Sequence, residues 1–481
     1  VMLKLLNWKP KDNVKLVDTM IISQLNNFRR EGKHSLANFG KILKDAKGDS
    51  PAFDHYSEEM KVYGIQDINL THKVYKYVVN EAQTLIANRP NFKNALQTEH
   101  AIAEICARQV ITKWNFDTPK AKKFYEQLTA EMKVIEDEIN PTLKPRKVLI
   151  DKEPKKAKYL QDGRFSAVSA RMLSEFTGTE IKQTDTDKWD PKKTFQRFKM
   201  TEANLGNMDM VRGLLLDNGW IPSMFTPGGE PKITEDTLHT IKGGMGQKVL
   251  KYYQLRSRHS VIRGWIELAE LNQGRVMVES FGIGTPTFRQ RHSKVVNVPN
   301  SNAFFGKEMR SLFIADEGKV MVGCDSSGNQ IRALAHYLNN KEVNDHILNG
   351  DIHQRTADAV GVSRPLAKGL LYATIFGAGN SKIGKMVTGV EDGDKGKEIK
   401  NKLYNALPGL KELIEKLNRF FYTTKNKDGL GFIPGLDGRR IYAESSFKCL
   451  NYLLQTFEAI SVKSAVVNAF KMFKDENIEV D

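Results

Sequence analysis

The stretch 361–384 carries a regular ladder of side chains that restricts how it can fold. Four residues recur there at intervals of four: Arg364, Lys368, Tyr372 and Phe376. At about 3.6 residues per turn, such positions follow one face of a single helix. Ser363 is suited to cap the start of this helix, and the proline after Arg364 falls in the first turn, where it is tolerated. We therefore predict a helix that presents two cations followed by two aromatic rings.

A row of this kind suits a nucleoside triphosphate, because cations bind phosphates and flat rings contact a sugar and a base. The alternative is an ordinary amphipathic helix whose Arg and Lys side chains are solvated, since charged helix faces are common. The ladder alone does not separate these interpretations. A second feature, which lies upstream, favours the first.

That second feature is the segment 319–338. The apolar run Val320–Val322 predicts a short buried strand, and Asp325 follows at its end. A helical pattern resumes at Ile331. A carboxylate at the end of a core strand is well placed to bind a divalent metal. The alternative is an Asp that caps the following helix.

Together, Asp325 and the downstream R-x3-K-x3-Y-x3-F-G helix resemble motifs A and B of the DNA polymerase I family (family A), in particular the replicative polymerases of bacteriophages. The resemblance implies an α+β multidomain fold, a right hand of thumb, palm and fingers preceded by a partial RNase H-like exonuclease domain. It implies template-directed addition of dNTPs to a primer 3′ end. The implied domains are 1–95 (partial 3′–5′ exonuclease), 96–264 (thumb with a basic insertion), 265–345 (palm with motif A), 346–447 (fingers with the motif B helix) and 448–481 (incomplete palm).

The resemblance also assigns roles at the nucleotide site. Asp325 and the Ser326 carbonyl would bind Mg²⁺, with two ions in the complete site. His353, Arg364 and Lys368 would contact the triphosphate, and Phe376 would stack near the templating base. Tyr372 holds a position that is Phe or Tyr in the family, where a Tyr reduces discrimination against dideoxynucleotides, and we expect the same here. These roles describe phosphoryl transfer by positioning and charge neutralisation.

Gln330 stands where most of the family has a Glu that excludes a 2′-hydroxyl and bonds to a Tyr of the motif B helix. In this sequence that Tyr position is Phe376. Because both ends of the pair differ together, no buried carboxylate is left without its partner. Gln is close to Glu in volume, so we expect selection of deoxyribonucleotides to persist.

Other residues match family positions that hold primer–template DNA. They are Arg289 and Arg291 (two candidates for one family arginine), Gly377, Asn451, Gln455, Arg439 and Arg440. Asn451 and Gln455 lie four apart on a predicted helix over 448–473, and such a pair can read minor-groove acceptors shared by every correct base pair. Arg439 and Arg440 follow a D-G turn in a predicted hairpin over 431–442, and we expect them to contact template phosphates.

The start of the chain, residues 1–95, reads as mixed α/β, with a predicted strand near Val14 that runs into a helix. Tyr63 and Asp67, four apart on a predicted helix, resemble the third motif of the proofreading exonuclease, although a surface Tyr and Asp would look the same. The other exonuclease motifs would precede Val1, and motif C would follow Asp481. We therefore expect that this chain alone has no proofreading activity and extends a primer poorly or not at all. It would be either part of a longer reading frame or one part of a split enzyme.

Charge and composition fit a partner that is rich in phosphate. The chain of 481 residues has 73 Lys and Arg against 57 Asp and Glu, a net charge of +16, although ribosome-associated or merely basic proteins share this feature. The basic stretch 144–164 is either a solvated loop or a thumb-tip segment that follows phosphates, with a processivity factor as a further candidate partner.

Three distant cysteines fit a reducing cytoplasm, that of the host cell for a phage protein. We expect a monomer without a membrane span.

Two alternatives remain at this stage. A single-subunit RNA polymerase shares motifs A and B, but the exonuclease-like residues and the bulky Gln330 argue against it. A non-catalytic DNA-binding subunit, or half of a split polymerase, would keep the same DNA-binding residues.

Overall fold

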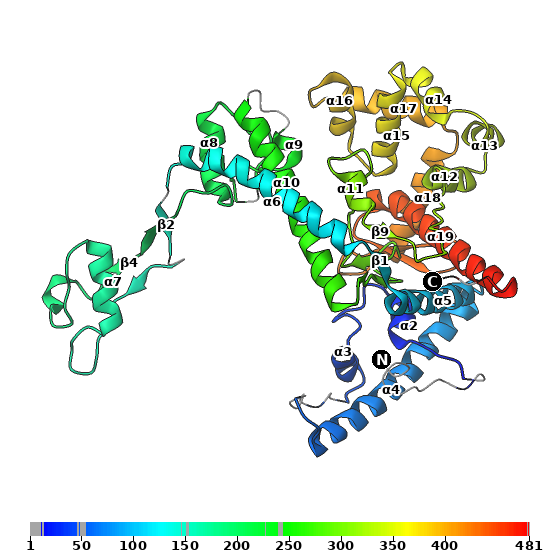
Figure 1. Ribbon diagram of the computed structural model, residues 1–481. Helices are drawn as coiled ribbons and strands as arrows, with labels where there is room; N and C mark the ends of the chain where they lie inside the picture. The colour runs from blue at the N-terminus through cyan, green and yellow to red at the C-terminus, as the bar shows by residue number, and fades with distance from the viewer. Residues whose placement is uncertain are drawn as a thin grey trace. The chain divides into compact units, whose positions relative to one another are not determined.

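A computed structural model describes residues 11, 14–45, 48, 54–145, 147–150, 153–226, 228–238, 244–478 and 480 (Figure 1). The chain divides into two compact units. Unit 1 comprises Val1–Trp114, Met277–Val296 and Asp316–Asp481, and unit 2 comprises Asn115–Val276 and Asn297–Ala315. No helix among these described ranges is long and apolar enough to cross a membrane.

Unit 1 is mainly helical. Its first helices are α2 (Thr19–Asn26), α3 (Leu36–Ile42), α4 (Glu58–Asn88) and α5 (Phe92–Thr112). A short hairpin follows, formed by β7 (Glu279–Phe281) and β8 (Arg291–Ser293). The C-terminal part contains α12 (Asn329–Leu338), α13 (Lys341–Leu348), α14 (Ile352–Val360), α15 (Arg364–Ile375), α16 (Asn380–Thr388), α17 (Gly393–Ala406), α18 (Leu410–Thr424), β10 (Gly431–Pro434), β11 (Arg440–Ala443), η3 (Ser446–Lys448) and α19 (Cys449–Asp475).

The N-terminal part of unit 1 corrects the expectation of mixed α/β structure. The described residues up to position 95 form helices and no strand. The strand expected near Val14 is absent there, and Val14, Leu16 and Val17 are exposed. Apolar residues favour a strand only where a neighbouring strand pairs with them. The predicted helix that contains Tyr63 is confirmed and continues as α4 to Asn88.

Helix α15 is confirmed as predicted. Ser363 occupies the N-cap position in an extended conformation, and the helix ends at Ile375. Phe376 is the C-cap, and Gly377 follows with a φ of +78°. The apolar side of α15, which includes Leu371, packs into a core shared with α12, α18, α19 and the β10–β11 hairpin. Of the ladder residues, Tyr372 packs against the edge of that core, whereas Arg364, Lys368 and Phe376 are exposed.

The β10–β11 hairpin and α19 also follow the sequence prediction. Ile433 and Ile441 pair across the two strands, and both are fully buried. Gly438, in the predicted D-G turn, has a φ of +82°, which a glycine adopts without strain. Helix α19 contributes Leu450 and Leu453 to the same core as this hairpin.

The buried strand predicted at Val320–Val322 is wrong. Val320, Met321 and Val322 are 82%, 54% and 87% exposed, and the segment is neither helix nor strand. An apolar run forms a stable strand only when its backbone N–H and C=O groups find a partner, and none of the described strands pairs with it. The helix expected after it is present as α12, which begins at Asn329.

Unit 2 combines long helices with short strands. Its elements are β1 (Trp114–Phe116), α6 (Thr118–Ile139), η1 (Asn140–Thr142), β2 (Lys147–Leu149), β3 (Lys155–Lys156), α7 (Ala167–Thr177), η2 (Thr186–Lys188), β4 (Thr194–Phe195), β5 (Phe198–Met200), α8 (Met208–Asp217), α9 (Glu235–Leu238), α10 (Gly244–Leu271), β6 (Arg275–Val276), α11 (Gly306–Arg310) and β9 (Phe313–Ile314). Helices α6 and α10 pack together, and β6, β1 and β9 form a sheet in that order. Trp265 packs its buried ring against Phe116 and Phe313.

The basic stretch 144–164 is more than a solvated loop. Strand β2 pairs with β5, and β3 pairs with β4. These ribbons lead to a small core built around Phe165, Leu173 and Phe195. Residues 115–264 of the thumb expected over 96–264 belong to unit 2. The first part of that range, which includes most of α5, belongs to unit 1.

Candidate functional site

Helices α14 and α15 bring one set of predicted residues together. Asp351 caps α14, since its carboxylate accepts hydrogen bonds from the backbone N–H groups of His353 and Gln354. The same carboxylate accepts a hydrogen bond of 2.6 Å from Arg364 Nε at the start of α15. Asp351 was not predicted, although an Asp directly before a helical pattern is a recognisable capping signal. We call the face formed by His353, Arg364, Lys368, Tyr372 and Phe376 the α14–α15 surface.

Three aromatic rings follow one another along the α14–α15 surface. The ring centroids of His353 and Tyr372 are 6.1 Å apart, and those of Tyr372 and Phe376 are 5.9 Å apart. Burial lowers the pKa of His353, and the charges of Lys368 and Arg364 lower it further, against an opposing effect of Asp351. The lowered pKa favours the neutral form of the imidazole over the charged form. Two cations beside a neutral ring system make a surface that attracts an anion with a flat group attached.

A second set of residues lies along α19. Gln455 Nε2 donates a hydrogen bond of 2.8 Å to Asn451 Oδ1, which agrees with their predicted position on one helix face. The hydroxyl of Thr287 donates to Gln455 Oε1 at 3.2 Å. Glu458 follows on the same side of α19, because positions three apart are neighbours on a helix. We call Asn451, Gln455 and Glu458 the polar row of α19.

Glu458 connects the polar row of α19 to two other segments of unit 1, and sequence reasoning missed it. Its carboxylate forms an ion pair with Arg289 and accepts a hydrogen bond of 3.1 Å from Gln330 Nε2. Burial raises the pKa of Tyr372, and the negative charge of Glu458 raises it further. The negative charge of Glu458 thus acts on Tyr372 of the α14–α15 surface. The spacing from Asn451 through Gln455 to Glu458 is the signal that could have identified it.

The structure separates the two arginine candidates. Arg289 faces α19 through its ion pair with Glu458. Arg291 belongs to β8, is exposed, and stacks over the ring of Phe281 on β7, 4.7 Å from the ring centroid. Only Arg289, of this pair, contacts the polar row of α19.

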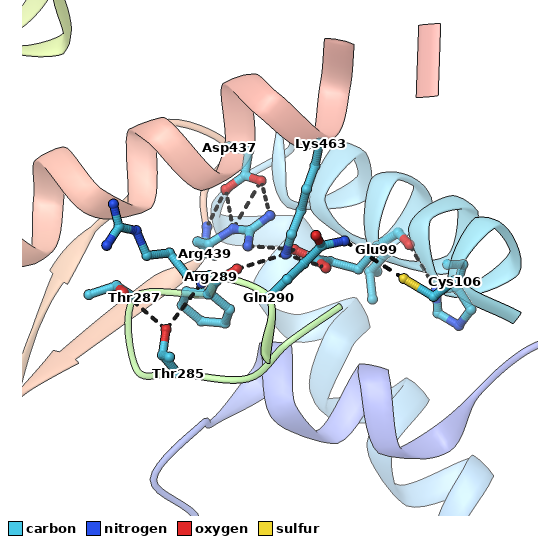
Figure 2. A network of polar contacts seen from close by, with 12 residues as sticks. Glu99, Cys106, Thr285, Thr287, Arg289, Gln290, Asp437, Arg439 and Lys463 are labelled. Atoms are coloured by element: carbon cyan, nitrogen blue, oxygen red, sulfur yellow. Dashed lines mark hydrogen bonds and ion pairs between the residues drawn. The ribbon is translucent and has the colours of Figure 1, made fainter. Parts of the chain in front are cut away.

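A buried network of four charged groups holds the segment that carries Arg289 (Figure 2). Glu99 and Arg439 are 0% exposed, Lys463 is 3% exposed and Asp437 is 9% exposed. Arg439 donates to Asp437 through Nε and Nη2 and to Glu99 through Nη1 at 2.8 Å. Lys463 Nζ donates to both oxygens of Glu99. Two carboxylates therefore balance two cations, as a buried set of charges requires.

This network corrects the prediction for Arg439. Its guanidinium is enclosed and bound to Asp437 and Glu99, so the structure does not present it to a template phosphate. Its role is internal, because it stacks on the ring of Phe288 at 4.7 Å and Lys463 Nζ donates to the Phe288 carbonyl at 2.7 Å. Phe288, with a φ of +60°, is thus fixed against α5 and α19. Figure 2 shows the neighbouring Thr287 and Arg289 carried by the same loop.

Arg440 and Gly377 have packing roles of their own. Arg440 is partly buried, and its guanidinium lies over the ring of Phe432 at 4.8 Å. Gly377 combines a positive φ with a close approach to Phe447, whose carbonyl oxygen would overlap a Cβ at position 377. The close backbone approach at Gly377 is therefore one within this chain.

Asp325 and Ser326 lie in the exposed segment before α12. Asp325 makes no hydrogen bond or ion pair with another described residue. Within the described parts of the chain, no group of three or more His, Cys, Asp or Glu side chains is placed to hold a metal ion. Among the described residues, Asp325 is therefore not part of a group of three or more such side chains. Tyr63 and Asp67 lie four apart on α4 and belong to no such group either.

Comparison with known proteins extends these observations. The sequence model of DNA polymerase family A matches residues 179–481, which is more than half of the chain. The DNA-directed DNA polymerases of Escherichia phage T7 and Enterobacteria phage T3 are each 23% identical to it, over 98% of this chain and 79% of theirs. A DNA-directed DNA polymerase of Escherichia phage Phieco32 is 26% identical over 57% of this chain and 56% of its own length.

A solved structure has the same fold. It is the POL domain of Pol1 from M. smegmatis in complex with DNA primer–template and dNTP. The TM-score is 0.67, at 13% sequence identity, with 96% of this chain and 72% of that chain covered. At this level of identity, the likeness concerns the fold alone.

Proposed function

The chain belongs to DNA polymerase family A and is a DNA-directed DNA polymerase, and we propose that its α14–α15 surface binds the incoming dNTP. Membership of this family argues against the alternative function of a single-subunit RNA polymerase. The observation that carries the proposal is the continuous arrangement of Arg364, Lys368 and His353 beside the rings of Tyr372 and Phe376. Cations at one end and rings at the other match the polarity of a nucleotide.

In this proposal Arg364 and Lys368 neutralise the triphosphate, and His353 donates a hydrogen bond to it. While the nucleotide is absent, Asp351 orients Arg364 because its carboxylate accepts a hydrogen bond of 2.6 Å from Arg364 Nε. Tyr372 and Phe376 lie against the sugar and the base. Charge neutralisation by fixed side chains is the main route by which proteins promote phosphoryl transfer.

Primer–template DNA would lie along the polar row of α19. Asn451 and Gln455 would donate to minor-groove acceptors. Arg289 would reach the same groove from the loop that is bound to Lys463 by a hydrogen bond. Such contacts test the geometry of a base pair and not its identity. Arg440 remains a candidate for a template phosphate, and Gly377 would lie near the template.

The metal chemistry implied by the family is assigned only to Asp325. The Asp325 carboxylate and the Ser326 carbonyl would contribute to Mg²⁺ binding, although the described residues form no group of three or more metal-ligating side chains there. Tyr63 and Asp67 would be a remnant of an exonuclease, and the folded basic insertion would offer a surface for a processivity factor.

Nucleotide binding to a preformed complex with primer–template tests the proposed surface. We expect Lys368→Ala to weaken dNTP binding about tenfold, the effect of one lost charged hydrogen bond, while primer–template affinity stays unchanged. Lys382→Ala is the matched control, because Lys382 is an exposed lysine on the next helix, α16. Equal dNTP affinity in both variants and the parent would overturn the proposal.

A further inference from the structure

Glu458 occupies a junction between three parts of unit 1. It projects from α19, pairs with Arg289 from the segment that follows β7, and accepts a hydrogen bond of 3.1 Å from Gln330 on α12. Both donors reach the same oxygen, Oε2. The side chain is 27% exposed, so the contact is partly shielded from water. One carboxylate thus links a residue expected at the minor groove with a residue expected at the sugar.

The chemistry of the contact fixes the orientation of Gln330. An ionised carboxylate only accepts hydrogen bonds, whereas an amide has one donating and one accepting end. Gln330 must therefore direct Nε2 toward Glu458 and turn Oε1 away from it. A Gln without this partner would rotate about its terminal torsion, which has broad minima. The hydrogen bond to a charged acceptor is also stronger than one to a neutral acceptor.

We propose that Glu458 is a positioning residue for sugar selection: it holds the Gln330 side chain in the orientation that excludes a ribonucleotide. The inference rests on the proposed nucleotide site, because it requires Gln330 to lie beside the sugar. The carboxylate that accompanies the sugar-contacting side chain is supplied by α19 and not by α12. Its ion pair with Arg289 connects sugar selection to the segment that contacts primer–template.

Replacement of Glu458 tests this role. We expect Glu458→Ala to lower the preference for dNTP over rNTP about tenfold in nucleotide binding to a preformed complex with primer–template, the effect of one lost charged hydrogen bond. Glu458→Gln keeps an acceptor without charge, so its loss of preference should be smaller. A general disturbance of the fold would weaken binding of both nucleotides equally and leave the ratio of their affinities unchanged. Glu444→Gln is the matched control, because Glu444 is a partly exposed ion-paired carboxylate bound to Arg29 and Lys448 instead.

An exchange of the two groups sharpens the test. Gln330→Glu alone places two carboxylates at hydrogen-bond distance, and their repulsion should lower the preference for dNTP. Combined with Glu458→Gln, it restores one carboxylate and one amide with the donor and acceptor reversed, and the preference should recover. The absence of recovery would overturn the inference.

Gln330→Ala separates this inference from the proposal beneath it. If Gln330→Ala lowers the preference for dNTP but Glu458→Ala does not, Glu458 has no positioning role and the inference fails alone. If Gln330→Ala leaves the preference unchanged, the sugar contact itself is wrong and both fail. Circular dichroism and thermal unfolding of each variant establish that the folded protein is being compared.

Discussion

The ammonium of Lys463 donates to both carboxylate oxygens of Glu99, at 2.7 Å each, although the two residues are 364 positions apart in the chain. The pair joins α5 to α19, and Arg439 and Asp437 extend it to the β10–β11 turn. Burial lowers the pKa of Lys463, whereas the Glu99 carboxylate raises it. The network therefore depends on every member, because each buried charge relies on an opposite charge beside it.

Glu99→Ala should destabilise unit 1 strongly. It leaves Lys463 and Arg439 buried with Asp437 as the only carboxylate of the network, and removal of one partner from a buried ion pair typically costs about 3–5 kcal/mol. Urea denaturation followed by circular dichroism measures the loss. Glu104→Ala is the control on the same helix, since Glu104 forms an exposed pair with Arg108 and such pairs contribute little. Equal midpoints for the two variants would contradict the role of the network.

Local patterns predicted the elements whose signals lie close together in sequence. Helix α15 has its cap and its first-turn proline within one stretch, and the β10–β11 hairpin has its turn between two apolar runs. The four-residue spacing of Asn451 and Gln455 likewise gave their common face. These features depend on backbone geometry and helix period, which a single segment determines.

Features that depend on distant partners could not be predicted in the same way. Arg439 follows a turn and was assigned to a phosphate, but its partner Glu99 is 340 positions away. The run Val320–Val322 indicates burial without indicating what would cover it, and it is exposed. Glu458 was the exception, since its position on the polar row of α19 was open to prediction from the helix period.

Gly377→Ala should destabilise the turn after α15. Gly377 has a φ of +78°, a conformation that costs other residues about 1–2 kcal/mol. A Cβ would also overlap the Phe447 carbonyl oxygen, so the expected loss exceeds this strain. Gly379→Ala is the control, because a Cβ there meets open space and its φ is −65°. Urea denaturation of the two variants should show a loss for the first alone, and equal stability would contradict the strain argument.

Arg289 and Arg291 should differ in their effect on DNA binding. We expect Arg289→Ala to weaken primer–template binding about tenfold, as the loss of one charged hydrogen bond would, because Arg289 faces the polar row of α19. Arg291→Ala should have a smaller effect, since its guanidinium stacks on Phe281. Fluorescence anisotropy with a labelled primer–template measures both at one fixed salt concentration. A larger loss for Arg291→Ala would reverse the assignment.

His353 should make stability depend on pH. Burial and the charges of Lys368 and Arg364 hold its pKa below the ordinary value of about 6.5, so the unfolded chain takes up the proton first as the pH falls. Stability should therefore decrease from about pH 6.5 downward, and His353→Gln should reduce that decrease. Urea denaturation at several pH values compares it with His55→Gln, whose imidazole is exposed. A bound triphosphate adds negative charge and should raise the pKa of His353 in an NMR titration; an unchanged pKa would place the phosphates elsewhere.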